Sequence, residues 1–415
     1  MSNLAITTSL SLMLLSGPLL ALAVRGFAPL LALAGLAALI AMLASFIAHR
    51  PRFQPATLRR HALPLAAFGY ILLSALWGVS DRAGDTAFRL LATSGFGAAI
   101  IWGFAQLPHD KKQIWTMRLL VSMAGGIALA LLIGPYNFYW PDLPELLEDQ
   151  FELLRQVNSA LSILPIFLFL LGLAWHRHRS KLIYGALGVA VLVTAVSESQ
   201  TSLLSMLLGL TAFALAKISR RLCRRLVFAA LTICTLCAPP IFIAAYENNW
   251  VEKYAPNIVT ERGAGEIRQW LYFVYAKEAV SRPLFGHGLN GTKYFAPQNL
   301  ESYATPVLNK PKVSNFAEAA LESGVVAAHA HNIFLQLIFE FGYVGALFIL
   351  TAIWQGFKRL DAALDDAAGV WMWGAIGAAL GTLMFGFTLW HSWLMAALAT
   401  SVVVAYFVHW ACPKN

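Results

Sequence analysis

The chain has 415 residues, of which 59% are hydrophobic and only 12% are charged. This balance excludes an ordinary soluble globular domain, in which about 25% of the residues are charged. The formal net charge of +9 is carried largely by short basic loops, so it predicts contact with anionic membrane lipids and gives no reason to expect a nucleic-acid partner.

Apolar segments follow one another along the chain, and each is close to the length that a helix needs to cross a bilayer. The sequence therefore predicts an all-α membrane protein with about twelve transmembrane helices. Most connections are short, which favours antiparallel packing of neighbouring helices. The predicted spans are residues 6–24, 27–48, 63–80, 87–107, 114–135, 157–175, 183–198, 201–217, 226–245, 331–356, 368–390 and 392–410.

The distribution of basic residues predicts the orientation of the chain. Basic clusters occur in alternate connections, and such loops stay on the cytoplasmic side of a membrane. Both termini are then expected in the cytoplasm and the two long connections outside. Residues 1–24 have no basic stretch before them, so we interpret them as the first span and not as a signal peptide. The clusters contain His49, Arg50, Arg52, Arg59 and Arg60; Lys111 and Lys112; Arg177, Arg179 and Lys181; Lys217, Arg220, Arg221, Arg224 and Arg225; and Lys358 and Arg359.

The two long connections are residues 136–156 and 246–330. The second is large enough to form a cap outside the membrane, either with a functional role or as a structural plug. Within it, Glu266–Ser281 has helical patterning that ends at Pro283 and the glycines after it. The expected parts are residues 1–245 with helices one to nine and the short periplasmic segment, 246–330 as the large periplasmic loop, and 331–415 with helices ten to twelve.

His331 stands at the start of the tenth predicted span, directly after the long loop. An imidazole titrates near neutral pH, so it can accept a proton from an attacking hydroxyl group. The alternative is a plain interfacial histidine. Asn332 is expected to cap or orient the helix. Gly342 and Gly345, two to three turns further on, are expected to let a neighbouring helix approach closely. This pattern predicts chemistry at a membrane surface.

Glu340 lies within the same span, where a carboxylate is costly unless it is paired or faces an aqueous cavity. At 100° per residue it points away from His331, so a structural role is expected, with hydrogen bonds to groups such as Gln336. His329, His331 and His287 are weak candidates for metal ligands, because no carboxylate or cysteine accompanies them at regular spacing. We therefore expect neither a metal nor a cofactor.

Two arginines on the outer side are candidates for binding an anionic group. Arg155 is at the outer mouth of the sixth span, and Arg268 is on the predicted loop helix. Guanidinium groups bind diphosphates in a fork geometry and keep their charge, so two of them beside a base favour a reaction with an anionic leaving group. The alternative for each is an interfacial anchor or a surface salt bridge. Further outward cations, expected to contact headgroups or sugar phosphates, are Arg89, Arg262, Arg282, Lys310 and Lys312.

These motifs resemble the bacterial O-antigen ligases and the related O-antigen polymerases. The resemblance extends over roughly residues 150–350 by motif and over the whole chain by topology. It rests on His331-Asn332 with Gly342 and Gly345, on Arg268 and Tyr272 followed by Pro283-Leu-Phe-Gly-His-Gly288, and on Arg155-Gln-Val-Asn158.

The resemblance implies transfer of a polysaccharide from undecaprenyl diphosphate to a lipid A-core acceptor. It places the reaction on the periplasmic face of the bacterial inner membrane, with inversion and without a metal, in a fold related to the C-type membrane glycosyltransferases. His331 would be the base, and Arg155 and Arg268 would hold the diphosphate. The residues expected to contact the substrates are Arg89, Arg262, Arg282, Asn332 and Tyr272.

Three other functions fit parts of the pattern. One is a protein-glycosylating ligase of the same superfamily, but such ligases usually carry more soluble mass than this chain offers. An O-antigen polymerase would use the same donor to extend a second undecaprenyl-linked chain, and no single residue separates it from the ligase. A transporter of lipid-linked sugars would place charged groups along a path through the middle of the membrane. In this chain they cluster at the outer mouth, which favours an enzyme.

Overall fold

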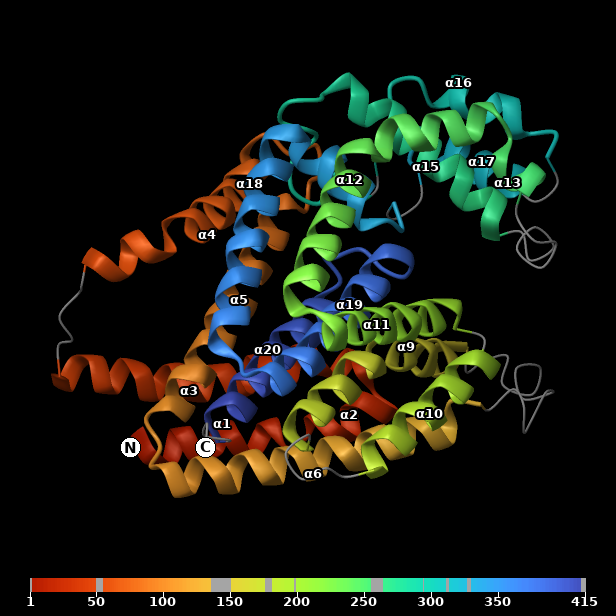
Figure 1. The fold of residues 1–415 in the computed structure, drawn as a ribbon. Helices are drawn as coiled ribbons and strands as arrows, with labels where there is room; N and C mark the ends of the chain where they lie inside the picture. Colours follow the sequence, from red (N-terminus) through yellow and green to blue (C-terminus); the bar gives the residue numbers. More distant parts are fainter. Residues whose placement is uncertain are drawn as a thin grey trace. The chain divides into compact units, whose positions relative to one another are not determined.

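The computed structural model describes residues 2–49, 55–135, 151–175, 181–197, 199–254, 264–293, 295–310, 313–326 and 330–411. Helices and short connections make up these residues, and no β-strand occurs among them (Figure 1). Ten of the described helices are long and apolar enough to cross a membrane, and His61–Leu76 and Lys181–Val196 are shorter apolar helices. Each predicted span overlaps one of these twelve, which confirms an all-α multi-pass membrane protein.

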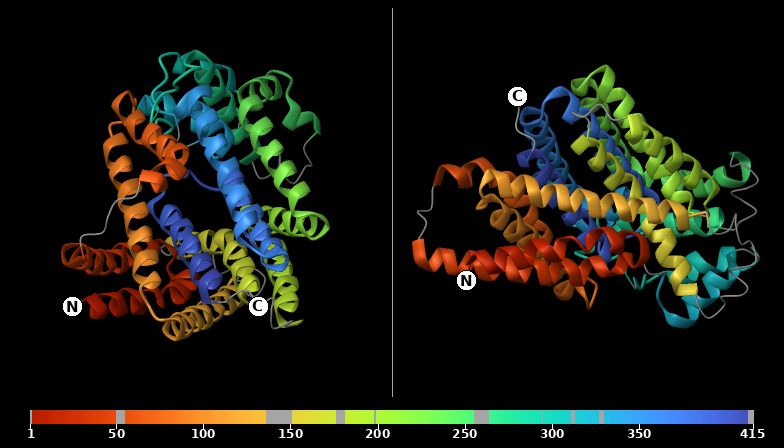
Figure 2. Two further views of the ribbon diagram at one scale, coloured as in Figure 1. Left: turned by 60° about the vertical axis from the view of Figure 1, so that its left-hand side comes forward. Right: turned by 90° about the horizontal axis from the view of Figure 1, so that it is seen from below.

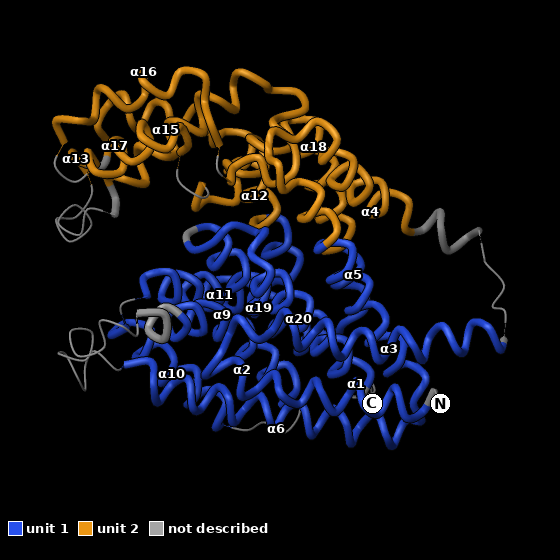
Figure 3. The backbone as a smooth tube through the Cα atoms, turned by 180° about the vertical axis from the view of Figure 1, so that it is seen from behind, with its two compact units in different colours: residues 1–53, 89–225, 358–415 blue, residues 54–88, 226–357 orange. Residues whose placement is uncertain are grey.

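The chain divides into two compact units (Figure 3). The first contains residues 1–53, 89–225 and 358–415, and the second contains residues 54–88 and 226–357. These two units are defined by which residues contact one another. The parts predicted from the sequence, divided at residues 245 and 330, are defined instead by their expected location in or outside the membrane, and they stay a prediction.

The first unit is a bundle of long helices, which Figure 2 shows from two further sides. Its helices are α1 (Ser2–Met13), α2 (Ser16–Leu22), η1 (Val24–Gly26), α3 (Phe27–His49), α6 (His109–Ile133), α9 (Phe151–Trp175), α10 (Lys181–Val196), α11 (Gln200–Ile218), α19 (Asp366–Phe385) and α20 (Ser392–Ala411). Three further helices run through both units: α5 (Ala83–Ala105), α12 (Arg220–Glu247) and α18 (Ile333–Ala363).

Helix α9 is the centre of this bundle, and its apolar side chains from Gln156 onward are almost all buried. Hydroxyl groups join α11 to α19 and α19 to α9. Ser205 donates to the carbonyl of Ala378 over 2.8 Å, and Thr382 donates to the carbonyl of Ser162 over 2.7 Å. Within a bilayer a hydroxyl group finds few other partners, so such bonds help to fix how neighbouring helices pack.

An ion pair joins the first turns of α12 to the end of α18. The guanidinium of Arg224 lies 2.6 Å from the carboxylate of Asp361, which also accepts a hydrogen bond from the indole of Trp373 over 3.0 Å. Both partners are largely buried. The start of α12 and the end of α18 therefore meet within the first unit. The side of the membrane on which the basic loops lie stays a prediction.

The second unit contains the described part of the long loop. Its central helix is α15, which confirms the helix predicted for Glu266–Ser281 and ends before Pro283 as expected. Two buried aromatic side chains hold α15 in place: Trp270 donates to the carbonyl of Tyr303 over 2.9 Å, and Tyr275 to that of Thr292 over 2.8 Å. The helices of this unit are α4 (Pro55–Leu73), η2 (Ser74–Leu76), α13 (Trp250–Tyr254), α15 (Ala264–Ser281), α16 (Leu300–Ala304), η5 (Thr305–Val307) and α17 (Ser314–Ser323).

Helix α18 is interrupted at Gly342, where the backbone has φ 62° and ψ −176°. Only glycine adopts this conformation readily, and a Cβ here would collide with the backbone of Leu284. The predicted close approach is confirmed, but at Gly342 its partner is a loop, so the predicted neighbouring helix is wrong there. At Gly345 the partner is a helix, because the ring of Tyr70 on α4 occupies the space.

Residues 283–288 make main-chain hydrogen bonds on both sides of this interruption. Two N–H groups of the loop donate to carbonyls before the break, and two carbonyls of the loop accept from N–H groups after it. Backbone polar groups of a membrane helix have to be satisfied within the protein, so the loop completes the helix. With the donor first, the bonds are His287 to Phe339 (2.8 Å), Gly288 to Glu340 (2.7 Å), Tyr343 to Pro283 (2.7 Å) and Val344 to Leu284 (3.2 Å).

Candidate active site

The start of α18 is capped by Asn332, as the sequence predicts. Its side-chain oxygen accepts hydrogen bonds from the main-chain N–H groups of Phe334 over 3.0 Å and Leu335 over 3.1 Å. These are two of the N–H groups that a helix start leaves without a partner. Asn332 is itself buried, so the helix start and the residue before it are held firmly.

His331 immediately precedes this cap and is half-buried. Its backbone has φ 49°, in the left-handed region that residues other than glycine seldom occupy. The main-chain carbonyl of His331 accepts a hydrogen bond from the hydroxyl of Tyr272 over 3.2 Å. A strained backbone that is held from both sides is characteristic of functional positions. The candidate base therefore stands on a fixed backbone between α15 and α18.

Tyr272 and Arg268 are four residues apart on α15, so they lie on the same side of that helix. The ring of Phe242 packs against Tyr272 with centroids 4.7 Å apart. Burial raises the pKa of Tyr272, and the nearby charge of Arg268 partly offsets this effect. The phenol thus stays protonated at neutral pH and donates to the His331 carbonyl. We call His331, Asn332, Tyr272 and Arg268 the His331 cluster.

Glu340 is fully buried and has the structural role that the sequence predicts. Its carboxylate accepts hydrogen bonds from the amide of Gln336 over 3.0 Å and from the hydroxyl of Thr292 over 2.8 Å. The hydrogen bond from Gln336 was expected, because Gln336 is one helical turn before Glu340. The hydrogen bond from Thr292 was not expected, because Thr292 lies 48 residues away in the chain.

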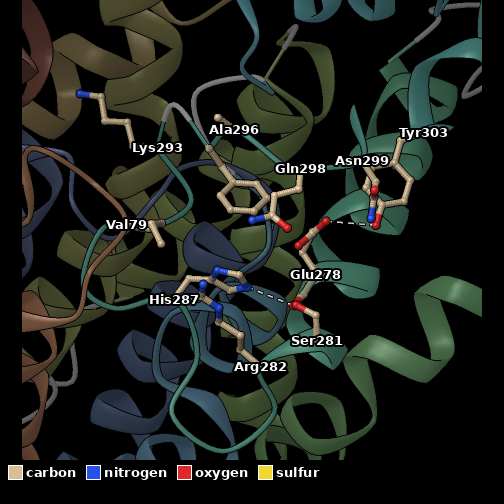
Figure 4. Close-up of a pocket in the computed structure, with 12 residues that line it drawn as sticks. Val79, Glu278, Ser281, Arg282, His287, Lys293, Ala296, Gln298, Asn299 and Tyr303 are labelled. Carbon is tan, nitrogen blue, oxygen red and sulfur yellow. Dashed lines mark hydrogen bonds between the residues drawn. The ribbon is translucent and has the colours of Figure 1, made fainter. Parts of the chain in front are cut away.

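The other predicted site residues fall elsewhere. Arg282 follows the end of α15, is exposed, and lines a cavity of about 360 Å³ that sequence reasoning missed (Figure 4). Arg89 on α5 and Arg155 on α9, the latter described only by its backbone, belong to the first unit. Their part in the site stays a prediction. Residues outside the described part of the chain include Arg262, Lys312 and His329.

The comparisons with known proteins agree with the sequence pattern. Residues 185–350, which contain the whole His331 cluster, match the family model described as O-antigen ligase. A protein provisionally named a polysaccharide ligase in Rickettsia typhi is 22% identical over 173 residues, and one in Rickettsia prowazekii is 23% identical over 175 residues. Each alignment covers 42% of this chain and 38% of the relative's length. No solved structure matches the chain.

Proposed function

Because residues 185–350 form an O-antigen ligase family domain in a multi-pass membrane protein, we propose that the protein is a glycosyltransferase. It moves O-antigen polysaccharide from undecaprenyl diphosphate to a hydroxyl group of a lipid A-core acceptor, at the periplasmic face of the inner membrane. The observation that supports this proposal most is the His331 cluster. His331 directly precedes the capped start of α18, and its main-chain carbonyl accepts a hydrogen bond from Tyr272.

In the proposed reaction the acceptor hydroxyl attacks the anomeric carbon of the donor sugar. A new carbon–oxygen bond forms while the bond to the diphosphate oxygen breaks, and the diphosphate leaves with the electron pair. Attack from the face opposite the leaving group inverts the configuration. His331 takes the hydroxyl proton, which a neutral imidazole can do near physiological pH.

The leaving diphosphate needs its negative charge balanced. Arg268 supports this role because it is only half-buried and lies one helical turn from Tyr272, within the His331 cluster. A guanidinium stays charged at any pH that the cell experiences and offers several N–H donors in one plane. Arg155 is the second proposed contact, from the sequence resemblance. With two guanidinium groups on the diphosphate, the proposed reaction needs no metal.

The direct test is replacement of His331 by Ala. Transfer of polysaccharide to lipid A-core, followed on gels of the lipopolysaccharide from a complemented deletion strain, should fall at least a hundredfold, the usual contribution of general-base catalysis. His109→Ala is the matched control, because His109 is exposed on α6 in the other unit. It should transfer normally. Near-normal ligation by a folded His331→Ala protein would show that His331 is not the general base.

The deletion strain also separates the proposed ligase from the polymerase. A ligase defect leaves uncapped lipid A-core together with accumulated lipid-linked polymer. A polymerase defect leaves core that bears single repeat units. The provisional name of both relatives, polysaccharide ligase, favours the first outcome.

A further inference from the structure

The cavity at the C-terminal end of α15 is a second feature that can bind a ligand (Figure 4). Its volume of about 360 Å³ lies at the lower end of the range for small-molecule sites, roughly 300–1,000 Å³. Side chains from the end of α15, from the loop after it and from the start of α16 line the cavity. The polar ones are Glu278, Ser281, Arg282, His287, Lys293, Gln298, Asn299 and Tyr303.

The polar groups of this cavity include both hydrogen-bond donors and acceptors. Arg282 and Lys293 only donate, the carboxylate of Glu278 only accepts, and the amides of Gln298 and Asn299 do both. Sugar hydroxyl groups also donate and accept, so a sugar ring can pair with this mixture. A simple inorganic anion would leave the Glu278 carboxylate facing a like charge. The composition therefore favours a sugar residue over phosphate.

The carboxylate of Glu278 is held in place by the hydroxyl of Tyr303, which donates to it over 3.0 Å. Burial, and after it the charge and the hydrogen bond of Glu278, raise the pKa of Tyr303 to about 12. Tyr303 is also the residue whose carbonyl accepts from Trp270, so α15 and α16 are joined at this point. The acceptor group of the cavity is thus fixed before any ligand binds.

His287 forms a rigid wall of the cavity. Its Nε2 lies 3.0 Å from the main-chain carbonyl of Glu278, which can only accept, so Nε2 carries the hydrogen. The ring stacks on Phe339 with centroids 4.3 Å apart, and the His287 carbonyl accepts from the N–H of Val79 over 2.9 Å. Because His287 belongs to the loop that completes α18, this wall is part of the helical framework.

We propose that this cavity is a saccharide subsite, which holds one sugar residue of the glycan that the protein transfers. The inference rests on the proposed function and adds a location for glycan recognition. Glu278 is six residues beyond Tyr272, or about 9 Å along α15 at 1.5 Å per residue. The subsite is therefore set back from the His331 cluster by about two turns of one helix, and it selects the glycan without touching the reacting atoms.

Two soluble probes distinguish the sources of this sugar. One is core oligosaccharide released by mild acid from the lipopolysaccharide of a strain without O-antigen. The other is polysaccharide released by mild acid from the lipid-linked donor. Binding of each to the detergent-solubilised full chain is measured by saturation-transfer NMR with titration. The wild-type protein and His331→Ala should bind one of the two probes with equal affinity.

The test variant combines Glu278→Gln with Asn299→Ala, and Tyr303→Phe is a second, single variant that keeps the ring and its main-chain contact with Trp270. Each loses hydrogen-bonding groups of the cavity, so we expect the double variant to bind at least tenfold more weakly and to show a raised KM at unchanged kcat. Glu301→Gln, an exposed carboxylate on α16 outside the cavity, is the control and should bind normally.

The outcomes separate the subsite from the proposed function. Unchanged affinity and KM in both cavity variants, or no binding of either probe to the wild-type protein, would overturn the subsite while His331→Ala can still abolish transfer. Retained transfer by His331→Ala with weakened binding in the cavity variants would leave the subsite standing and reject the proposed base.

Discussion

At the scale of single residues, contacts between near neighbours in the sequence could be predicted and distant ones could not. Asn332 caps α18 because its side chain reaches N–H groups two and three residues on. Gln336 meets Glu340 because one helical turn separates them. Thr292 reaches the same carboxylate from another segment, and Tyr303 reaches Glu278 in the same way. Residue type and spacing carry no information about such pairs.

Replacement of Asn332 by Ala should destabilise the protein by about 1 kcal/mol, because two N–H groups at the start of α18 lose their acceptor. Thermal unfolding in detergent would show a lower midpoint. Asn332→Asp keeps an acceptor and places a negative charge at a helix N-terminus, so it should unfold near the wild-type temperature. Equal midpoints for the Ala and Asp variants would contradict the capping role.

His287 should make stability depend on pH. Burial lowers its pKa from 6.5, with a further lowering by the charge of Arg282 and an opposing effect of the hydrogen bond to the Glu278 carbonyl. Between the lowered pKa and 6.5, the unfolded chain binds a proton that the folded chain does not. The stabilisation from a neutral His287 is therefore complete above pH 6.5 and decreases as the pH falls towards the folded-state pKa.

This dependence can be measured as the unfolding midpoint between about pH 7.5 and 5, the range over which histidines titrate. The wild-type midpoint should fall on acidification. In His287→Gln the amide can still donate to the Glu278 carbonyl but does not titrate, so the fall should be smaller. The same slope in both proteins would assign the pH dependence to other groups.

At the scale of elements, hydropathy predicts the spans but misses the interruption in α18. Apolar residues continue on both sides of Gly342, and glycine is common in membrane helices, so nothing in the pattern marks a break. The break exists because a separate loop, residues 283–288, supplies the missing hydrogen bonds. The motifs in both segments were recognised from the sequence, but the contact between them was not.

Gly342→Ala should prevent normal folding, because the substituted residue would have to adopt a conformation almost restricted to glycine and would collide with Leu284. The amount of monodisperse protein after detergent extraction should fall severely. Gly356→Ala on the same helix is the control, since a Cβ there meets nothing within 4 Å. It should be neutral or slightly stabilising. Equal yields of the two variants would show that the break tolerates a side chain.

At the scale of the whole molecule, composition alone predicted a helical membrane protein. Lipid cannot hydrogen-bond to the backbone, so a long apolar segment in a membrane has to form a helix whatever its particular side-chain contacts. Each predicted span has its helix. The two compact units could not be predicted, since they combine segments from distant parts of the chain, such as residues 54–88 with 226–357. Which segments pack together depends on the shapes of individual side chains, and a hydropathy profile does not contain that information.

The proposed orientation can be tested by cysteine labelling. In a variant without native cysteines, Glu301→Cys on α16 and Arg221→Cys at the start of α12 place single exposed thiols on opposite predicted sides. A membrane-impermeant maleimide should label position 301 in intact spheroplasts and position 221 only after lysis. The reverse pattern would invert the orientation that the basic loops predict.

The loop that completes α18 has a consequence for biosynthesis. Residues 283–288 leave the ribosome before α18 does, so the segment that repairs the break is already made when the broken helix enters the translocon. Until the two meet, α18 has unsatisfied backbone groups that lipid cannot solvate. We therefore expect insertion of this helix and docking of the preceding loop to be coupled. A ribosome stall between them would leave the backbone groups at the break without hydrogen-bond partners.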